Sequence, residues 1–292
     1  MRTTDLDAAS TRLRLLEQAR ARVDRAQTVA ASGLKNVKGS DDPAWLELNS
    51  RTRSDGLMND RSRKSLAAAS TRLEATESAL SSVSDLFARL QEIAVQGGTD
   101  TYAANDRRVL ANEVRSLKSQ ALAAANAQSN GQFIFGGFRT NSPPFDASGN
   151  FLGDNNVMQV DAGSGKTAAA GIDSTSVFTP AGGVAIFSVF DAVATALDTN
   201  DGPAIRASLD SVQKSIEQVV DGRGAVGDAM NLVQRFSDWL DDSDLRLSAA
   251  RAASVDADPL SAYTDLAQAS NALDAALKTA AQATKLSLID YL

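Results

Sequence analysis

Two short stretches hold residue types that could carry out chemistry. The first is Gly163-Ser-Gly165-Lys166-Thr167, which matches the end of a phosphate-binding loop, where backbone amides and a lysine hold phosphate groups. A complete loop needs a glycine where this chain has Val160. The segment 168–171 is too short for the helix that should follow the loop, and it ends in a glycine. We therefore predict a β-turn at this position and no nucleotide or other cofactor.

The second stretch is acidic. Asp241, Asp242 and Asp244 are the residue types that bind calcium, but the loop glycine and the distal bidentate glutamate of a calcium loop are absent. The three aspartates also fall within a segment with helical periodicity. We predict a solvated helix face here and no metal site.

The composition narrows the function classes further. The 292 residues include no cysteine and no histidine, which removes disulfides, thiol nucleophiles and the commonest general base and metal ligand. We assign no catalytic residue and predict that the protein is not an enzyme. The net charge of −7 argues against a nucleic-acid surface. The chain lacks an apolar run long enough to span a membrane and lacks an N-terminal signal pattern, so we expect no membrane partner and no cleaved signal peptide.

A coiled-coil seam predicts the elements that position everything else. Two rows of residues seven apart run through residues 66–94, and Gly97-Gly98 ends them. A second helix from about Ala103 predicts an antiparallel hairpin. Helical periodicity returns at residues 186–197 and again from 203 to about 253, where three glycines between 222 and 227 lower helix propensity. The two seam rows are Leu66, Leu73, Leu80, Phe87 and Ala94, and Ala69, Thr76, Val83 and Leu90.

Between the helical halves, residues 131–185 have a different character. Ten of the 19 glycines and three of the six prolines lie there, with short runs rich in valine, isoleucine and phenylalanine. We predict strands at 132–135, 157–160 and 177–178, with turns at 147–150 and 153–154. This segment is predicted to be an inserted, small β-rich domain.

The two ends of the chain carry matching apolar stripes. Both are rich in alanine and repeat at steps of three and four, so we expect them to pair as helices. Residues 1–30 hold six arginines against four acids, whereas residues 258–292 hold two lysines against four aspartates, so opposite charges favour the pairing. The residues that we expect at the assembly interface are Leu6, Leu13, Leu16, Val23, Leu266, Leu273, Leu277, Leu286 and Ile289.

These patterns predict a mainly α fold: a long antiparallel helical bundle or coiled-coil rod with paired terminal helices and an inserted β-rich domain. The predicted divisions are terminal arms at 1–39 and 254–292, a rod at 40–130 and 186–253, and the β-rich domain at 131–185. Leu277, Leu286 and Ile289 lie off the pairing stripe, so one partner helix would not cover the C-terminal arm. We infer that other copies of the chain, or a related chain, supply the missing cover.

Several strings resemble the flagellin superfamily. Ser40-Asp41-Asp42-Pro43-Ala44 matches the string at the start of the second helical segment in that family. The stretch from Gly131 to Gly137, which includes Phe133, Phe135, Gly136 and Gly137, is similar to the start of the outer domain in the hook-associated, or hook–filament junction, proteins. Residues 1–4 and 286–292 also resemble the ends of those proteins.

The resemblance implies a structural component of the bacterial flagellum. Its implied location is extracellular, at the hook–filament junction, after export through the flagellar type III apparatus. Its implied partners are further copies of itself in a ring, a neighbouring hook-associated protein on the hook side, the flagellin filament on the distal side and an export chaperone.

Two other functions remain open from the sequence. A short filament flagellin would share the helical layout but would form long polymers. A soluble coiled-coil adaptor would be a folded dimer with ordered ends.

Overall fold

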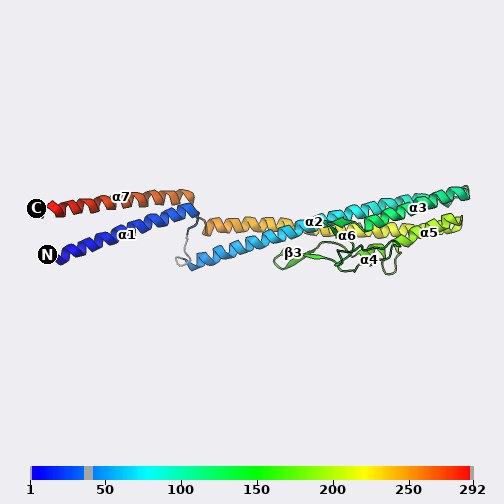
Figure 1. Cartoon of the computed structure of the whole chain (residues 1–292), viewed down its shortest axis with the longest axis horizontal. Coiled ribbons are helices and arrows are strands. Elements are labelled where there is room, and N and C mark those ends of the chain that lie inside the picture. The colour runs from blue at the N-terminus through cyan, green and yellow to red at the C-terminus, as the bar shows by residue number, and fades with distance from the viewer. Residues whose placement is uncertain (1, 36–41, 290–292) are drawn as a thin grey trace. The chain divides into compact units, whose positions relative to one another are not determined.

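The computed structural model describes the backbone of residues 2–35 and 42–289 and the side chains of residues 10–35, 42–253 and 255–282. The described chain is mainly helical, as predicted (Figure 1). It divides into two compact units: unit 1 comprises Met1–Leu57 and Asp242–Leu292, and unit 2 comprises Met58–Asp241. The elements are α1 (Arg2–Ser32), α2 (Pro43–Gly97), α3 (Ala104–Ala125), β1 (Gln128–Ser129), β2 (Gln132–Phe133), β3 (Gln159–Gly163), β4 (Lys166–Ala169), α4 (Ser174–Phe178), α5 (Ile186–Asp198), α6 (Gly202–Ser254) and α7 (Pro259–Ile289).

Unit 2 is built around the predicted seam in α2. All nine seam side chains are at most 2% exposed, so the period in the sequence marks the buried face of the helix. Helix α6 runs antiparallel to α2, because the residue numbers of the contacts rise along one helix and fall along the other. Three polar contacts show this register: Arg63 with Asp241, Glu77 with Arg223, and Gln91 with Gln213.

Helices α3 and α5 complete the helical part of unit 2. The Arg89 guanidinium pairs with Glu113 at 2.7 Å, which joins α2 to α3 as the predicted antiparallel hairpin. Lys118 of α3 pairs with Asp191 of α5 at 2.7 Å. The buried Arg107 donates to the backbone carbonyl of Gly97 at 2.8 Å, and it thereby fixes the end of α2.

The β-rich segment has less strand than predicted. Strands β1 and β2 form one antiparallel pair and β3 and β4 form another. The predicted strand at 132–135 ends at Phe133, and the one predicted at 157–160 lies at 159–163. The strand predicted at 177–178 is wrong, because these residues belong to helix α4. The Asp173 carboxylate accepts a hydrogen bond from the Thr175 amide at 2.9 Å and caps that helix, a local signal that competes with strand formation.

Phenylalanine rings hold the β-rich segment to the helices. The Phe145 ring contacts both Phe178 and Phe187, with ring centroids 4.8 Å and 5.2 Å away, and those two rings stack on each other. Phe187 belongs to α5, so the segment and the helices share one hydrophobic core.

Arg72 of α2 also joins the helix to the β-rich segment. Its guanidinium donates to the carbonyls of Phe133 and Ile134, both at 3.0 Å, and burial lowers the pKa of Arg72.

The two stretches considered for chemistry lie in a turn and on a helix. Ser164 and Gly165 make the turn between β3 and β4, with φ of 51° and 73°, so the predicted β-turn is confirmed. The Lys166 ammonium lies 4.7 Å from the ring of Trp239, where it makes a cation–π contact. Asp241 pairs with Arg63, and the part of the chain that the structure describes contains no group of acidic residues arranged to hold a metal ion. None of the described helices has the length and hydrophobicity that a bilayer-spanning segment needs.

The three glycines between residues 222 and 227 do not interrupt α6. A side chain at Gly222 would collide with Val177, which is fully buried and β-branched and so has little freedom to move. Gly222 is therefore the place where α4 packs directly against α6. Gly224, two residues later, has open space around it.

This contrast gives a stability prediction. Gly222→Ala should lower the melting temperature of the purified protein, because overpacking costs roughly 1–3 kcal/mol and exceeds the gain in helix propensity. Gly224→Ala is the matched control and should be stabilising by about 0.5–1 kcal/mol, since the same helix gains propensity without a clash. Thermal unfolding followed by circular dichroism measures both. Equal effects of the two substitutions would show that the contact with Val177 does not matter.

Candidate assembly interface

The terminal helices α1 and α7 pack against each other in unit 1, as the stripes predict (Figure 1). They are antiparallel, because contacts that rise in residue number along α1 fall in residue number along α7. Leu16 lines a hollow together with Ala280, whereas Val29, further along α1, lines one together with Ala262. On α7 the side chains that face α1 lie at regular steps of four and three residues. These are Ala262, Leu266, Ala269, Leu273, Ala276 and Ala280, and they include most of the predicted stripe.

Helix α1 presents a slightly different face from the predicted one. Leu16, Val23 and Ala30 are half-buried, but Ala19 and Ala26 complete the seam in place of Leu13, which is 63% exposed. This rotation leaves Arg20 at the surface. Small alanine side chains thus bring the helices together, and the larger Leu13 points away from α7.

The remaining predicted interface residues fall into two groups. Leu277 is 40% exposed and lies off the seam, as the sequence indicates. The side chains of Leu6, Leu286 and Ile289 lie outside the described residues. Which residues contact another copy of the chain stays a prediction.

A short backbone ladder fixes the base of the helix pair. Leu34 and Asp256 form an antiparallel bridge, and the amide of Ala257 donates to the carbonyl of Gly33 at 2.8 Å. The side chain of Val255 is fully buried beside this ladder, and its carbonyl accepts a bond from the Trp45 indole at 3.4 Å. The sequence analysis did not predict this anchor. The available signals were Val255, an apolar residue between polar ones, and Trp45, which follows soon after Pro43.

Asp258 caps the start of α7. Its carboxylate accepts hydrogen bonds from the Leu260 amide at 3.2 Å and from the Ser261 hydroxyl at 2.9 Å. The bond from Ser261, followed by that from Leu260, holds the pKa of Asp258 below its usual range. The charged carboxylate thus stabilises the first turn of α7.

The other motif residues have structural roles. Asp42 accepts bonds from the amides of Ala44 and Trp45 at 3.0 Å and 3.1 Å, which caps α2 at Pro43. Ser40 and Asp41 lie outside the described residues.

The second motif lies in unit 2. Phe135 is fully buried, Phe133 is half-buried, and a side chain at Gly136 would collide with the Arg139 carbonyl. Gly137 has a φ of 66° beside the Asp154 carboxylate, so the turn there needs a glycine.

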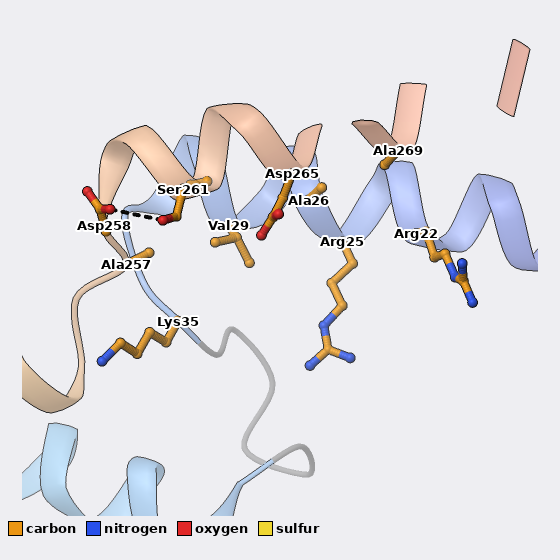
Figure 2. A pocket seen from close by; sticks show the side chains of 11 residues that line it. Arg22, Arg25, Ala26, Val29, Lys35, Ala257, Asp258, Ser261, Asp265 and Ala269 are labelled. Carbon is orange, nitrogen blue, oxygen red and sulfur yellow. Dashed lines mark hydrogen bonds between the residues drawn. The ribbon is translucent and has the colours of Figure 1, made fainter. Parts of the chain in front are cut away.

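The two helices of the pair carry opposite charge along their packed lengths. Residues 12–30 of α1 contain five arginines against Glu17 and Asp24, whereas residues 259–277 of α7 contain two aspartates and no basic residue. Between the helices near their base is a groove of about 550 Å³. Figure 2 shows Arg22, Arg25 and Val29 of α1 and Asp265 of α7 pointing to the same side of the pair. The arrangement offers apolar and charged contacts to another helix but no catalytic constellation.

Comparisons with known proteins identify what the chain resembles. Residues 4–140 match the sequence profile of the bacterial flagellin N-terminal helical region. The chain is 26% identical over 282 residues to flagellar hook-associated protein 3 of Escherichia coli K12, which covers 88% of this chain and 89% of that protein.

Two solved structures share the fold. One is a Vibrio parahaemolyticus protein assigned as a flagellar hook-associated protein, with a TM-score of 0.67 and 21% identity over 74% of this chain and 99% of that chain. The other is the flagellar junction protein FlgL of Legionella pneumophila, with a TM-score of 0.58 and 15% identity over 71% of this chain and 98% of that chain.

The Asp258 cap predicts how acid affects the helix pair. The charged form is favoured in the folded state, so its stabilisation is complete above the ordinary carboxyl pKa of about 3.9 and is lost as the pH falls through the lowered folded value. Backbone amides at the start of α7 should therefore lose protection from hydrogen exchange in acid. Asp258→Asn keeps an uncharged cap and should weaken this pH dependence. The same acid response in both proteins would contradict the assignment.

Proposed function

Because this chain belongs to the flagellin family of flagellar proteins and is a homologue of flagellar hook-associated protein 3, we propose that it joins the flagellar hook to the filament. It is a structural component outside the cell and not an enzyme. In this role its copies form a ring through their terminal helices. Another hook-associated protein lies on the hook side of the ring, and the flagellin filament lies on the distal side.

The observation that carries this proposal is the incomplete burial of the α1–α7 pair. Among the described side chains of α1 none is buried, and in α7 only Ala262 is. Large apolar side chains instead point outward, including Leu13 at 63% exposed and Tyr263 at 63% exposed. A helix pair with this surface needs further neighbours to cover it. A ring of identical chains supplies them, because each copy then packs between two others.

The energetics of the pair lead to the same function. Ordering a backbone costs about 1–2 kcal/mol per residue, whereas burial returns roughly 25 cal/mol for each Å² of apolar surface. Alanine-rich seams bury little area, so the pair alone gains little from folding. We propose that the terminal arms are disordered in the isolated chain and become rigid during assembly. Before assembly an export chaperone covers their apolar faces.

A short filament flagellin is the second candidate, since both kinds of protein share the N-terminal helical region. The relative that covers most of this chain is a hook-associated protein 3, which favours the junction. The two functions differ in the product of assembly. A junction protein stops at a short ring, whereas a filament flagellin polymerises without limit.

Deletion of the gene separates the two candidates. A strain without the junction protein should retain hooks, lack filaments and release flagellin into the medium, because flagellin is still exported but has nothing to attach to. Electron microscopy and an immunoblot of the medium measure these outcomes, and a plasmid copy of the gene should restore filaments. Filaments that persist in the deletion strain would refute the junction role. Loss of flagellin itself would identify the chain as the filament subunit.

The seam of the arms provides a second test. Leu273→Asp places a carboxylate against α1, where it removes about 1–2 kcal/mol of apolar burial and adds a desolvation cost. The variant should be exported but should not attach filaments, while the thermal unfolding of unit 2 stays unchanged. Asn271→Asp is the matched control, since it adds the same charge at an exposed position two residues away. If the Leu273→Asp strain carries normal filaments, the seam is not needed for assembly.

A further inference from the structure

The tip of the β3–β4 hairpin packs against two helices at once. A side chain at Gly163 would lie 3.3 Å from Leu240 and 3.4 Å from Trp239, both of which belong to α6. The same side chain would lie 3.5 Å from the hydroxyl of Ser62 in α2. All of these residues belong to unit 2. The backbone at the hairpin tip therefore lies close to both long helices within one compact unit.

An irregularity in the hairpin brings its backbone this close. Asp161 pairs with Thr167 and Gly163 pairs with Lys166, so Ala162 has no counterpart on β4. Such a bulge re-aims the strand, and here Ala162 and Gly163 are both buried although they are consecutive. The Asp161 carboxylate accepts a hydrogen bond from the Gly163 amide at 3.1 Å, which satisfies the backbone of the bulge.

Each strand of the hairpin also holds one of the helices by a side-chain contact. On β3, the Asp161 carboxylate accepts a hydrogen bond from the Ser62 hydroxyl of α2 at 3.1 Å. On β4, the Lys166 ammonium lies 4.7 Å from the ring of Trp239 and 5.8 Å from that of Phe236. Both rings belong to α6 and are half-buried. The hairpin thus bridges α2 and α6 through two contacts of different chemistry.

Hydrophobic burial holds the hairpin less firmly than the rest of the β-rich segment. Its fully buried side chains are those of Ala162 and Ala168, whereas Phe135 and Phe145 anchor the neighbouring part of the segment. Alanine removes much less apolar surface from water than phenylalanine does. Whether the hairpin stays in place therefore depends strongly on the polar and cation–π contacts at its tip.

We propose that the β3–β4 hairpin is a latch, which closes over α2 and α6 at the end of unit 2 and opens locally while the rest of the unit stays folded. When it opens, the rings of Phe236 and Trp239 gain access to solvent. The two helices then keep the ion pair between Arg63 and Asp241, which joins them at the same level at 2.9 Å. This inference does not depend on the junction role of the protein.

Two predictions separate a latch from a passive covering loop. The contacts with α2 and α6 should open together, because one rigid hairpin carries both. Opening should also be confined to the elements under the hairpin, since local openings require less free energy than unfolding of a packed core. The amides near Leu80 and Phe87, in the buried seam of α2, should therefore not respond to it.

A wedge under the hairpin tip tests where the opening occurs. Gly163→Asn should force the tip away from both helices, because its side chain needs the space held by Leu240, Trp239 and Ser62. Gly165→Asn is the matched control. Both glycines have positive φ, of 89° and 73°, which asparagine tolerates better than most residues, but Gly165 has open space around it.

Hydrogen exchange of the purified full chain, followed by mass spectrometry, measures the wedge. In Gly163→Asn, the amides of residues 60–66 and 236–241 should exchange roughly tenfold faster than in the natural chain. Gly165→Asn should leave them unchanged. Equal exchange in the two variants would overturn the proposal. Faster exchange that extends to Leu80 and Phe87 would also overturn it, because the hairpin would then be part of the common core.

A second experiment tests whether the two contacts open together, and it decides the matter if Gly163→Asn does not fold. Ser62→Ala removes the hydrogen bond to Asp161 on the α2 side, while the readout is Trp239 on the α6 side. In a Trp45→Phe background Trp239 is the single tryptophan, because the natural chain has two. Ser82→Ala is the matched control, since it removes an exposed hydroxyl of the same helix.

Quenching of tryptophan fluorescence by acrylamide reports the access of solvent to the ring. Ser62→Ala should raise the quenching constant of Trp239 roughly twofold, because loss of one contact opens the whole latch. Ser82→Ala should leave it unchanged. The same quenching constant in Ser62→Ala and in the natural Ser62 background would contradict the latch. Neither experiment requires assembly, so its failure is distinct from failure of the junction role.

Discussion

The proposed assembly depends on one weak contact, the alanine-rich seam between α1 and α7. Many of its side chains are alanines, and the described side chains of α1 are at best half-buried. The contact specifies which helices pair and in which register without making the pair self-sufficient. A stronger seam, with leucine at every position, would produce a stable free hairpin with less need for neighbours. In the proposed assembly, neighbouring copies supply the burial that this weak pairing lacks.

Unit 2 is built on the opposite principle. Its α2 seam is fully buried, its phenylalanine rings join the β-rich segment to α5, and Arg107 fixes the connecting turns. Its core is therefore closed without the help of a neighbouring copy. The base of the arms is also defined, because the Leu34–Asp256 bridge and the Asp258 cap fix where α7 begins. The arms thus combine a defined base with incomplete burial along their length.

The long periodic elements could be predicted from the sequence because their burial repeats along the chain. The α2 seam and the α7 stripe are local patterns that few other structures would explain. Shorter elements could not be predicted equally well. Val177 and Phe178 have high strand propensity, but the Asp173 cap and their burial against neighbouring elements produce a helical turn.

The candidate site was predictable only in part. The stripe on α7 follows from spacing, but the rotation of α1 that exposes Leu13 depends on which alanines allow the closest approach. The groove also could not be predicted, since it requires the register that sets Arg25 and Val29 beside Asp265. Register between two helices of similar small residues is specified weakly by sequence. It is set here by the backbone bridge at the base of the pair.

Hydrogen exchange measured on the isolated chain and on assembled junctions tests the central claim most directly. The amides of α1 and α7 should exchange rapidly in the isolated chain and slowly in the assembly, because neighbouring copies supply the missing burial. The amides of the α2 seam, near Leu80 and Phe87, should be protected in both states and serve as the internal reference. Strong protection of α7 in the isolated chain, equal to that in the assembly, would contradict the account.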